Sequence, residues 1–204
     1  MSYIPGISIN AYESSVVEGN SITLTATTNS NSPISWTSSH QGIAIVDSNG
    51  VVSGIKAGSA VITASVTENG VTISDTCTVY VTIENGVYYV KNNNSSKYLQ
   101  AEDYGLDDMN MILQNNKLST STGEQVKLSQ MWKIYYIGSG YYTIRPMSKL
   151  SMAWDYSPLE LMLYEKTDTD TLSNTDEYTR WRIENSSGYT IKNASCENVL
   201  QIEN

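Results

Sequence analysis

The amino-acid sequence predicts two all-β domains in series, one over residues 1–84 and one over residues 86–204. Two observations lead to this prediction. In the first domain, polar and apolar residues alternate with a period of two, and turn residues interrupt the alternation at short intervals, as expected for half-buried strands. In the second domain, short landmarks recur about every 50 residues, and the segments between them show no helical periodicity.

The alternation in the first domain is clearest in three segments, at residues 21–27, 61–66 and 77–83. These segments are rich in β-branched residues, which favour the pleated backbone. The dipeptide Asn-Gly stands twice between strand patterns, at 49–50 and 69–70, and it is a strong hairpin signal because both residues tolerate positive φ. About seven short strands in a domain of this length is the spacing of a β-sandwich.

Within the same domain, three sequence elements lie at fixed spacings. They read W-T-S-S from Trp36, I-A-I-V-D-S-N-G-V-V-S-G from Ile43, and A-G-S-A-V-I-T-A from Ala57. Together they resemble the bacterial Ig-like domain of group 2, over about residues 8–83, with Ile43 where that family usually has valine. The resemblance implies an Ig-like β-sandwich with Trp36 in its core. It also implies a spacer or adhesive module on a surface or secreted bacterial protein.

The second domain contains an internal repeat, which is marked by a tyrosine, a leucine and a tryptophan in each copy. The landmarks are Tyr88, Tyr142 and Tyr189 at the start of strand patterns, then Leu99, Leu150 and Leu200, then Trp132 and Trp181. Three landmarks with one common spacing indicate three copies of a unit of four short strands. Three such units around a pseudo-threefold axis form a β-trefoil.

The landmark motifs of this domain resemble those of the ricin B-type lectin family, over about residues 86–204. Residues 95–101 match S-x-K-Y-L-x-A, and Gln130-Met131-Trp132 matches Q-x-W. The resemblance implies a ricin-type β-trefoil lacking the end of its third repeat, because a third tryptophan is expected near position 230. We favour a truncated chain as the explanation. The alternative is that strands from a neighbouring molecule complete the barrel.

In the family that this domain resembles, each sugar site uses an acid after the second-strand leucine and an aromatic ring at the end of the third strand. The acid positions are then Gln100, Ser151 and Gln201, so all three acids are expected to be replaced. The second repeat ends its third strand in Tyr164, which we expect to be the stacking ring, with Trp154 or Asp155 from the preceding loop beside it. The alternative is a Tyr164 that only packs at the rim. Trp132 and Trp181 are expected in the core.

Composition and motifs exclude several functions. The net charge of −9 and a pI near 4.5 argue against binding nucleic acid or an anionic membrane, since both require a basic patch. No apolar stretch is long enough for membrane insertion. Cys77 and Cys196 fall in different domains, and we expect no disulfide between them. His40 has no acid placed to orient it, so we expect no catalytic triad and no enzymatic activity. The acidic loop from Glu102 lacks the pattern of a calcium-binding loop, so we expect no metal, and we expect no cofactor.

These inferences lead to one principal hypothesis for the function. The chain is expected to be a non-catalytic carbohydrate-binding or adhesive accessory region of a larger secreted or cell-surface bacterial protein, with a glycan or cell-surface polysaccharide as its partner. The alternative is a structural spacer or protein-interaction module whose trefoil has lost sugar binding. The first residues, from Met1, lack the basic and apolar regions of a signal peptide, so we expect the chain to be the interior of a longer polypeptide.

Overall fold

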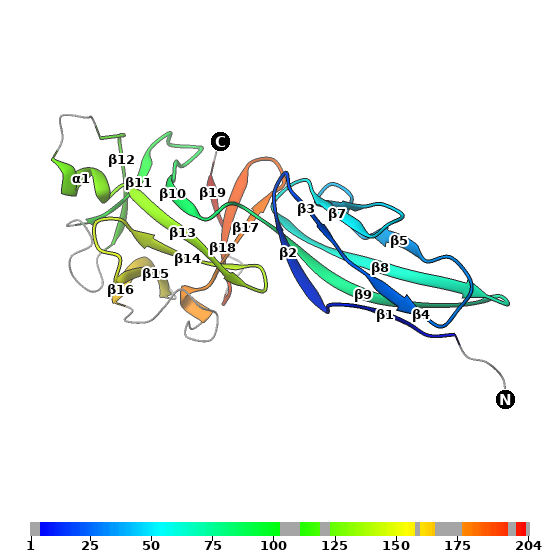
Figure 1. The fold of residues 1–204 in the computed structure, drawn as a ribbon. Coiled ribbons are helices and arrows are strands. Elements are labelled where there is room, and N and C mark those ends of the chain that lie inside the picture. The colour runs from blue at the N-terminus through cyan, green and yellow to red at the C-terminus, as the bar shows by residue number, and fades with distance from the viewer. Residues whose placement is uncertain are drawn as a thin grey trace. The chain divides into compact units, whose positions relative to one another are not determined.

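A computed structural model describes residues 5–102, 111–118, 123–157, 160–165, 177–195 and 199–202 of the chain (Figure 1). The chain divides into two compact units, Met1–Ile83 and Glu84–Asn204. Both are built from strands, so the predicted all-β class is confirmed. None of the described helices has the length and apolar character needed to span a membrane.

The first unit is a sandwich of antiparallel strands with one parallel pair. Its strands are β1 (Ile7–Ile9), β2 (Glu13–Val17), β3 (Ser21–Thr23), β4 (Ala26–Thr28), β5 (Ser35–Ser38), β6 (Ala44–Val46), β7 (Val51–Gly54), β8 (Gly58–Glu68) and β9 (Val71–Thr82). One sheet has the order β2-β9-β8-β5, a second has the order β3-β7-β6, and β1 pairs with β4. The β2–β9 pair is parallel. The predicted Ig-like sandwich is confirmed.

The core of this unit follows directly from the period-two alternation. In β8, Ala60 and Ile62 are buried, and across the ladder they pair with Val79 and Cys77, which are buried as well. Burial raises the pKa of the Cys77 thiol, and the charges of Asp75 and Glu13 raise it further, so the thiol stays protonated and unreactive. Cys77 forms no disulfide, and Cys196 lies outside the described residues.

Two glycines in the predicted motif are required by close approach of the backbone. Gly50 has φ +80°, and a Cβ atom there would lie against the carbonyl oxygen of Leu24 and 3.0 Å from the ring of Trp36. A Cβ atom on Gly54 would lie 2.9 Å from Val81. Trp36 is partly buried and packs against the core cluster of the sandwich. The spacing of these glycines therefore has a steric cause.

In the described part of the second unit there are ten strands and two short helical turns between them. The elements are β10 (Gly86–Tyr89), β11 (Tyr98–Ala101), β12 (Ile112–Asn115), α1 (Glu124–Leu128), β13 (Met131–Gly138), β14 (Tyr141–Pro146), β15 (Met152–Ser157), β16 (Glu160–Glu165), η3 (Glu177–Thr179), β17 (Trp181–Asn185), β18 (Tyr189–Asn193) and β19 (Val199–Ile202). The two short helices, α1 and η3, were not predicted, because the sequence shows no helical periodicity. No residue of α1 is buried.

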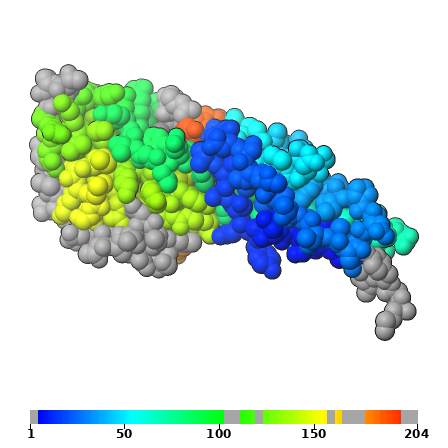
Figure 2. Space-filling model, in the orientation of Figure 1, coloured from blue at the N-terminus to red at the C-terminus, as the bar shows by residue number. Residues whose placement is uncertain are grey.

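The strand order of the second unit is that of a β-trefoil whose third repeat is represented by two strands. Six strands form one sheet in the order β10-β13-β14-β17-β18-β19, while β11–β12 and β15–β16 form separate hairpins. Each of the first two repeats thus gives its first and fourth strands to the sheet and its middle two to a hairpin. The third repeat gives β18 and β19, which pair over four residues. On the face shown in Figure 2, the green to yellow residues of the first two repeats form a closely packed surface.

Three tryptophans fill the centre of this unit. Trp132, Trp154 and Trp181 are each no more than 2% exposed. The ring centroids of Trp132 and Trp154 lie 5.0 Å apart, those of Trp154 and Trp181 lie 5.6 Å apart, and both pairs meet edge to face. Edge-to-face contacts of this kind add stability beyond the burial of area. The predicted core positions of Trp132 and Trp181 are confirmed.

Candidate functional site

The two hairpins of the second unit are equivalent, and hydrogen bonds from the tryptophans define the equivalence. The indole Nε1 of Trp132 donates to the carbonyl oxygen of Leu99 in β11, at 3.2 Å. The indole Nε1 of Trp181 donates to the carbonyl oxygen of Trp154 in β15, also at 3.2 Å. Each tryptophan therefore binds the second strand of its own repeat. Trp154 holds in the second repeat the position that Leu99 holds in the first.

This register corrects the predicted alignment of the second repeat. Leu150 is not equivalent to Leu99, because it is 45% exposed and precedes β15, where its carbonyl oxygen accepts a hydrogen bond from Nη1 of Arg145 at 3.0 Å. Ser151 therefore does not occupy the position that corresponds to Gln100. Asp155, the residue after Trp154, occupies it instead. The expectation that all three acids are replaced was wrong, because the second repeat has a carboxylate there.

Asp155 and Tyr164 lie on the same face of the β15–β16 hairpin. Asp155 pairs with Met162, and Tyr164 pairs with Ala153, two residues before Asp155. Residues that pair directly, or that lie two apart on one strand, project from the same side of a ribbon. Asp155 and Tyr164 are then diagonal neighbours, within reach of one another's side chains. Both are partly exposed, so the hairpin presents a carboxylate beside an aromatic ring.

Trp154 projects from the opposite face of the hairpin and cannot contact a ligand. Its side chain is fully buried, as is that of its pairing partner Leu163. The prediction that Trp154 contributes to a sugar site was therefore wrong. Strand alternation is the physical reason, since neighbours along a strand point to opposite faces and Asp155 takes the outer one.

The first repeat presents amides rather than a carboxylate, and these amides bind one another. The Oε1 atom of Gln100 accepts hydrogen bonds from Nδ2 of Asn115 at 3.1 Å and from Nε2 of Gln130 at 3.3 Å. Gln130 is fully buried, its Nε2 also donates to the carbonyl oxygen of Asn116, and its Oε1 accepts from the backbone N–H of Leu118. The glutamine of Q-x-W thus organises the end of this hairpin and engages Gln100 internally.

A further cluster on the first repeat was not predicted. The rings of Tyr89 and Tyr98 meet edge to face, with centroids 6.0 Å apart. The Nζ atom of Lys117 lies 4.7 Å from the Tyr89 centroid and 5.6 Å from that of Tyr98. Tyr98 lies in the 95–101 motif and Tyr89 follows the landmark Tyr88, but Lys117 belongs to no motif, so no sequence signal connected it to them.

The other predicted positions contribute less to a site. Gln201 lies on β19, where it pairs with Thr190, and its side chain is outside the described part. In the first unit His40 is exposed, and its Nδ1 contacts Oγ of Ser39 at 2.9 Å. Within the described ranges, no group of three acids, histidines or cysteines is placed to hold a metal. Most of the acidic loop after Glu102 falls outside those ranges.

One family model matches the chain. It is the bacterial Ig-like domain (group 2), over residues 4–85. The match covers the whole described sandwich and agrees with the motifs at Trp36, Ile43 and Ala57. No curated protein matches the sequence.

Several solved structures are similar to the chain at low identity. ThreeFoil, a designed 3-fold symmetric protein, is 18% identical over 59% of this chain and 91% of its own, with a TM-score of 0.42. An exo-β-1,3-galactanase from Clostridium thermocellum is 15% identical over 79% of this chain and 42% of its own, with a TM-score of 0.44. The surface layer protein SbsC is 16% identical over 81% of this chain and 26% of its own, with a TM-score of 0.34.

The chain thus spans less than half the length of the galactanase and of the surface layer protein. At TM-scores this low, the similarities carry no argument about function. The assignment of the trefoil rests on its strand order.

Proposed function

We propose that the chain is a non-catalytic carbohydrate-binding or adhesive accessory region of a larger secreted or cell-surface bacterial protein. The observation that carries the proposal is the shared outer face of Asp155 and Tyr164 on the β15–β16 hairpin. The resemblance of the second unit to ricin B-type lectins supports it, because Asp155 stands at the acid position and Tyr164 ends the third strand. The bacterial Ig-like match supports a location outside the cell.

The two side chains suit the two kinds of surface on a sugar ring. The carboxylate of Asp155 accepts hydrogen bonds from neighbouring hydroxyls, and hydrogen bonds to a charged group are stronger than neutral ones. The phenol ring of Tyr164 packs on the C–H face of a pyranose. A monosaccharide of about twelve non-hydrogen atoms, at about 0.3 kcal/mol each, would bind with a Kd on the order of 1 mM. Useful avidity would then require several copies of the region.

The proposal is tested by titrating neutral monosaccharides and oligosaccharides into the intact chain and its variants. Tyr164→Ala and Asp155→Asn are each expected to weaken binding at least about tenfold, because each removes an interaction worth about 1.4 kcal/mol or more. Tyr178→Ala is the matched control, since Tyr178 is exposed in the same unit and belongs to no proposed site. Absence of binding across a glycan array, with an intact fold, would contradict the proposal.

The second candidate function is a spacer or protein-interaction module without sugar binding. The observation that favours it is the first repeat, where Gln100 is held by Asn115 and Gln130. An internally bonded amide competes with any ligand for the same acceptor.

If a neighbouring molecule supplies strands to the trefoil, sedimentation analysis would give an oligomer at micromolar concentration. A strict monomer of normal thermal stability would argue against that partner.

A further inference from the structure

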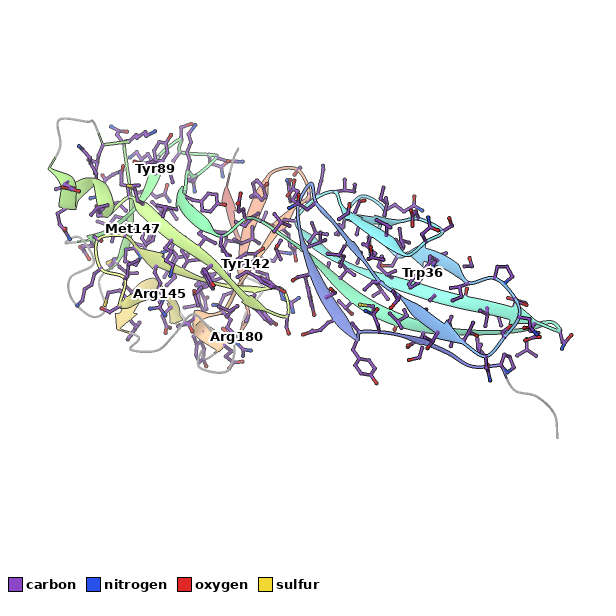
Figure 3. The ribbon with its side chains drawn as sticks, viewed as in Figure 1. Trp36, Tyr89, Tyr142, Arg145, Met147 and Arg180 are labelled. Atoms are coloured by element: carbon purple, nitrogen blue, oxygen red, sulfur yellow. The ribbon has the colours of Figure 1, made fainter. Side chains whose placement is uncertain are left out.

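Two arginines lie close together at the start of β17 in the second unit. Arg180 directly precedes the strand and is partly exposed, and Arg182 is its second residue and is exposed. Strands β14 and β17 pair at Tyr142 and Trp181, which are both buried and face the core. Their neighbours Tyr141 and Arg182 are partly exposed and exposed. Figure 3 shows where Tyr142, Arg145 and Arg180 lie in the second unit.

Two of the arginines share one tyrosine ring. The Cζ atom of Arg182 lies 4.7 Å from the ring centroid of Tyr141, and its Nη2 donates to the phenol oxygen at 2.8 Å. The Cζ atom of Arg180 lies 5.3 Å from the same centroid. The backbone of Arg180 is fixed as well, because its carbonyl oxygen accepts from the N–H of Ala194 at 2.8 Å. The two guanidinium groups are thus held together by β17 and Tyr141.

Within the described ranges, these two guanidinium groups have no ion pair of the kind that Lys192 forms nearby. Lys192 pairs with Glu184 at 2.7 Å, on the adjoining stretch of β17 and β18. No carboxylate among the described residues pairs with Arg180 or Arg182, and the buried Nε of Arg180 has no acceptor there. A cation–π contact offsets only about 0.5–1 kcal/mol for an exposed cation. Two like charges on one ring, with a buried donor unused, therefore form a site that an anion would complete.

The donors present match an oxyanion. Guanidinium groups present paired N–H donors that fit the oxygens of a carboxylate, sulfate or phosphate. The hydroxyl of Tyr141 accepts from Arg182 and so retains its own hydrogen to donate. The whole chain carries a net charge of −9, which repels long polyanions and leaves a single small oxyanion as the fitting ligand.

We propose that Arg180, Arg182 and Tyr141 form a binding site for one oxyanion, a carboxylate, sulfate or phosphate group carried by a small ligand. The site is separate from the Asp155 and Tyr164 pair and does not depend on sugar binding there. Arg145 is not part of it, because Arg145 is 4% exposed and donates through Nη1 to the carbonyl oxygen of Leu150.

The experiment is an NMR titration that follows the arginine side-chain Nε–Hε signals of the intact chain. With three arginines there are three such signals, and single substitutions assign them. Sodium sulfate, sodium phosphate and sodium glucuronate are added separately, against sodium chloride at equal ionic strength. We expect saturable shifts of the Arg180 and Arg182 signals with at least one oxyanion, while the Arg145 signal stays in place as an internal control.

The variants distinguish a built site from general charge attraction. Arg180→Gln and Arg182→Gln are each expected to weaken binding about tenfold, the loss of one charge-assisted hydrogen bond. Tyr141→Phe keeps the ring and removes the hydroxyl, so it is expected to weaken binding by a smaller factor. Lys97→Gln, at an exposed position of the same unit, is expected to leave the affinity unchanged.

The titration results identify the class of oxyanion that binds. Saturation by glucuronate alone identifies a carboxylate ligand, saturation by sulfate alone a sulfate ester, and saturation by phosphate alone a phosphate ester, and each supports the site. Shifts that do not saturate with any oxyanion, or an affinity that Arg180→Gln and Arg182→Gln leave unchanged, would overturn it. The near-ultraviolet circular dichroism of the tryptophan cluster shows whether each variant is folded.

Discussion

The β11–β12 hairpin of the first repeat and the β15–β16 hairpin of the second share one register and expose different chemistry. In both, a tryptophan N–H binds the carbonyl oxygen of the core residue of the second strand, Leu99 in one and Trp154 in the other. On the outer face, the first hairpin carries Gln100 within an internal amide network, and the second carries Asp155 beside Tyr164. The comparison teaches that core packing positions the hairpin, while its outer residues vary independently.

The strongest test of this comparison is Trp154→Ala. If Trp154 is the core residue of the second hairpin, its loss leaves a large cavity between Trp132 and Trp181, and the second unit should lose about 3–5 kcal/mol of stability. The measurement is chemical denaturation followed by tryptophan fluorescence. Tyr178→Ala should change stability by no more than about 0.5 kcal/mol. If Trp154→Ala lowers the stability by less than about 1 kcal/mol, Trp154 is a surface residue and not part of the core.

The equivalence of Leu99 with Trp154, rather than with Leu150, makes a second prediction. Leu99→Ala should cost about 2–5 kcal/mol, because Leu99 is 5% exposed. Leu150→Ala should cost no more than about 0.5 kcal/mol, because Leu150 is 45% exposed. Thermal or urea unfolding of the two variants measures the difference. If the two variants lose the same stability, Leu150 rather than Trp154 would be the equivalent of Leu99.

A smaller effect is expected from Gln130→Ala in the first repeat. The substitution removes a fully buried side chain together with its hydrogen bonds to the Leu118 N–H and the Asn116 carbonyl oxygen, and each lost hydrogen bond costs about 0.5–1.5 kcal/mol. Gln114→Ala is the matched control, because Gln114 is exposed on the same hairpin, where its Oε1 accepts a hydrogen bond from the Ser95 hydroxyl at 2.6 Å. If the two variants unfold alike in urea, the amide network does not organise the hairpin.

Much of the fold could be predicted from the sequence. In segments such as 61–66, the alternation of polar and apolar residues follows the alternation of exposed and buried positions along a strand. It therefore predicted strand β8 and its buried residues. The positions of Trp132 and Trp181 followed from the repeat, because a repeated unit buries the same positions in each copy. Gly50 and Gly54 stood in the recognised motif, and the structure supplies the steric reason for both.

The candidate site was harder to predict, because it depends on register rather than composition. The second repeat was aligned on Leu150, yet a tryptophan can fill the core position that a leucine fills elsewhere, and only the hydrogen bond from Trp181 to Trp154 reveals the exchange. Asp155 was named as a candidate, but from a loop rather than from the acid position. The arginine cluster depends on the cross-strand pair of Tyr142 and Trp181, which lie far apart along the chain.

The edge-to-face stack of Trp132, Trp154 and Trp181 also has an optical consequence. Indole transitions at centroid separations of 5.0 and 5.6 Å couple to one another, so the three rings absorb and emit as one chiral chromophore. The fourth tryptophan, Trp36, belongs to the other unit and is not part of that stack. The exciton signal in circular dichroism therefore reports the assembly of the trefoil alone, without any attached label.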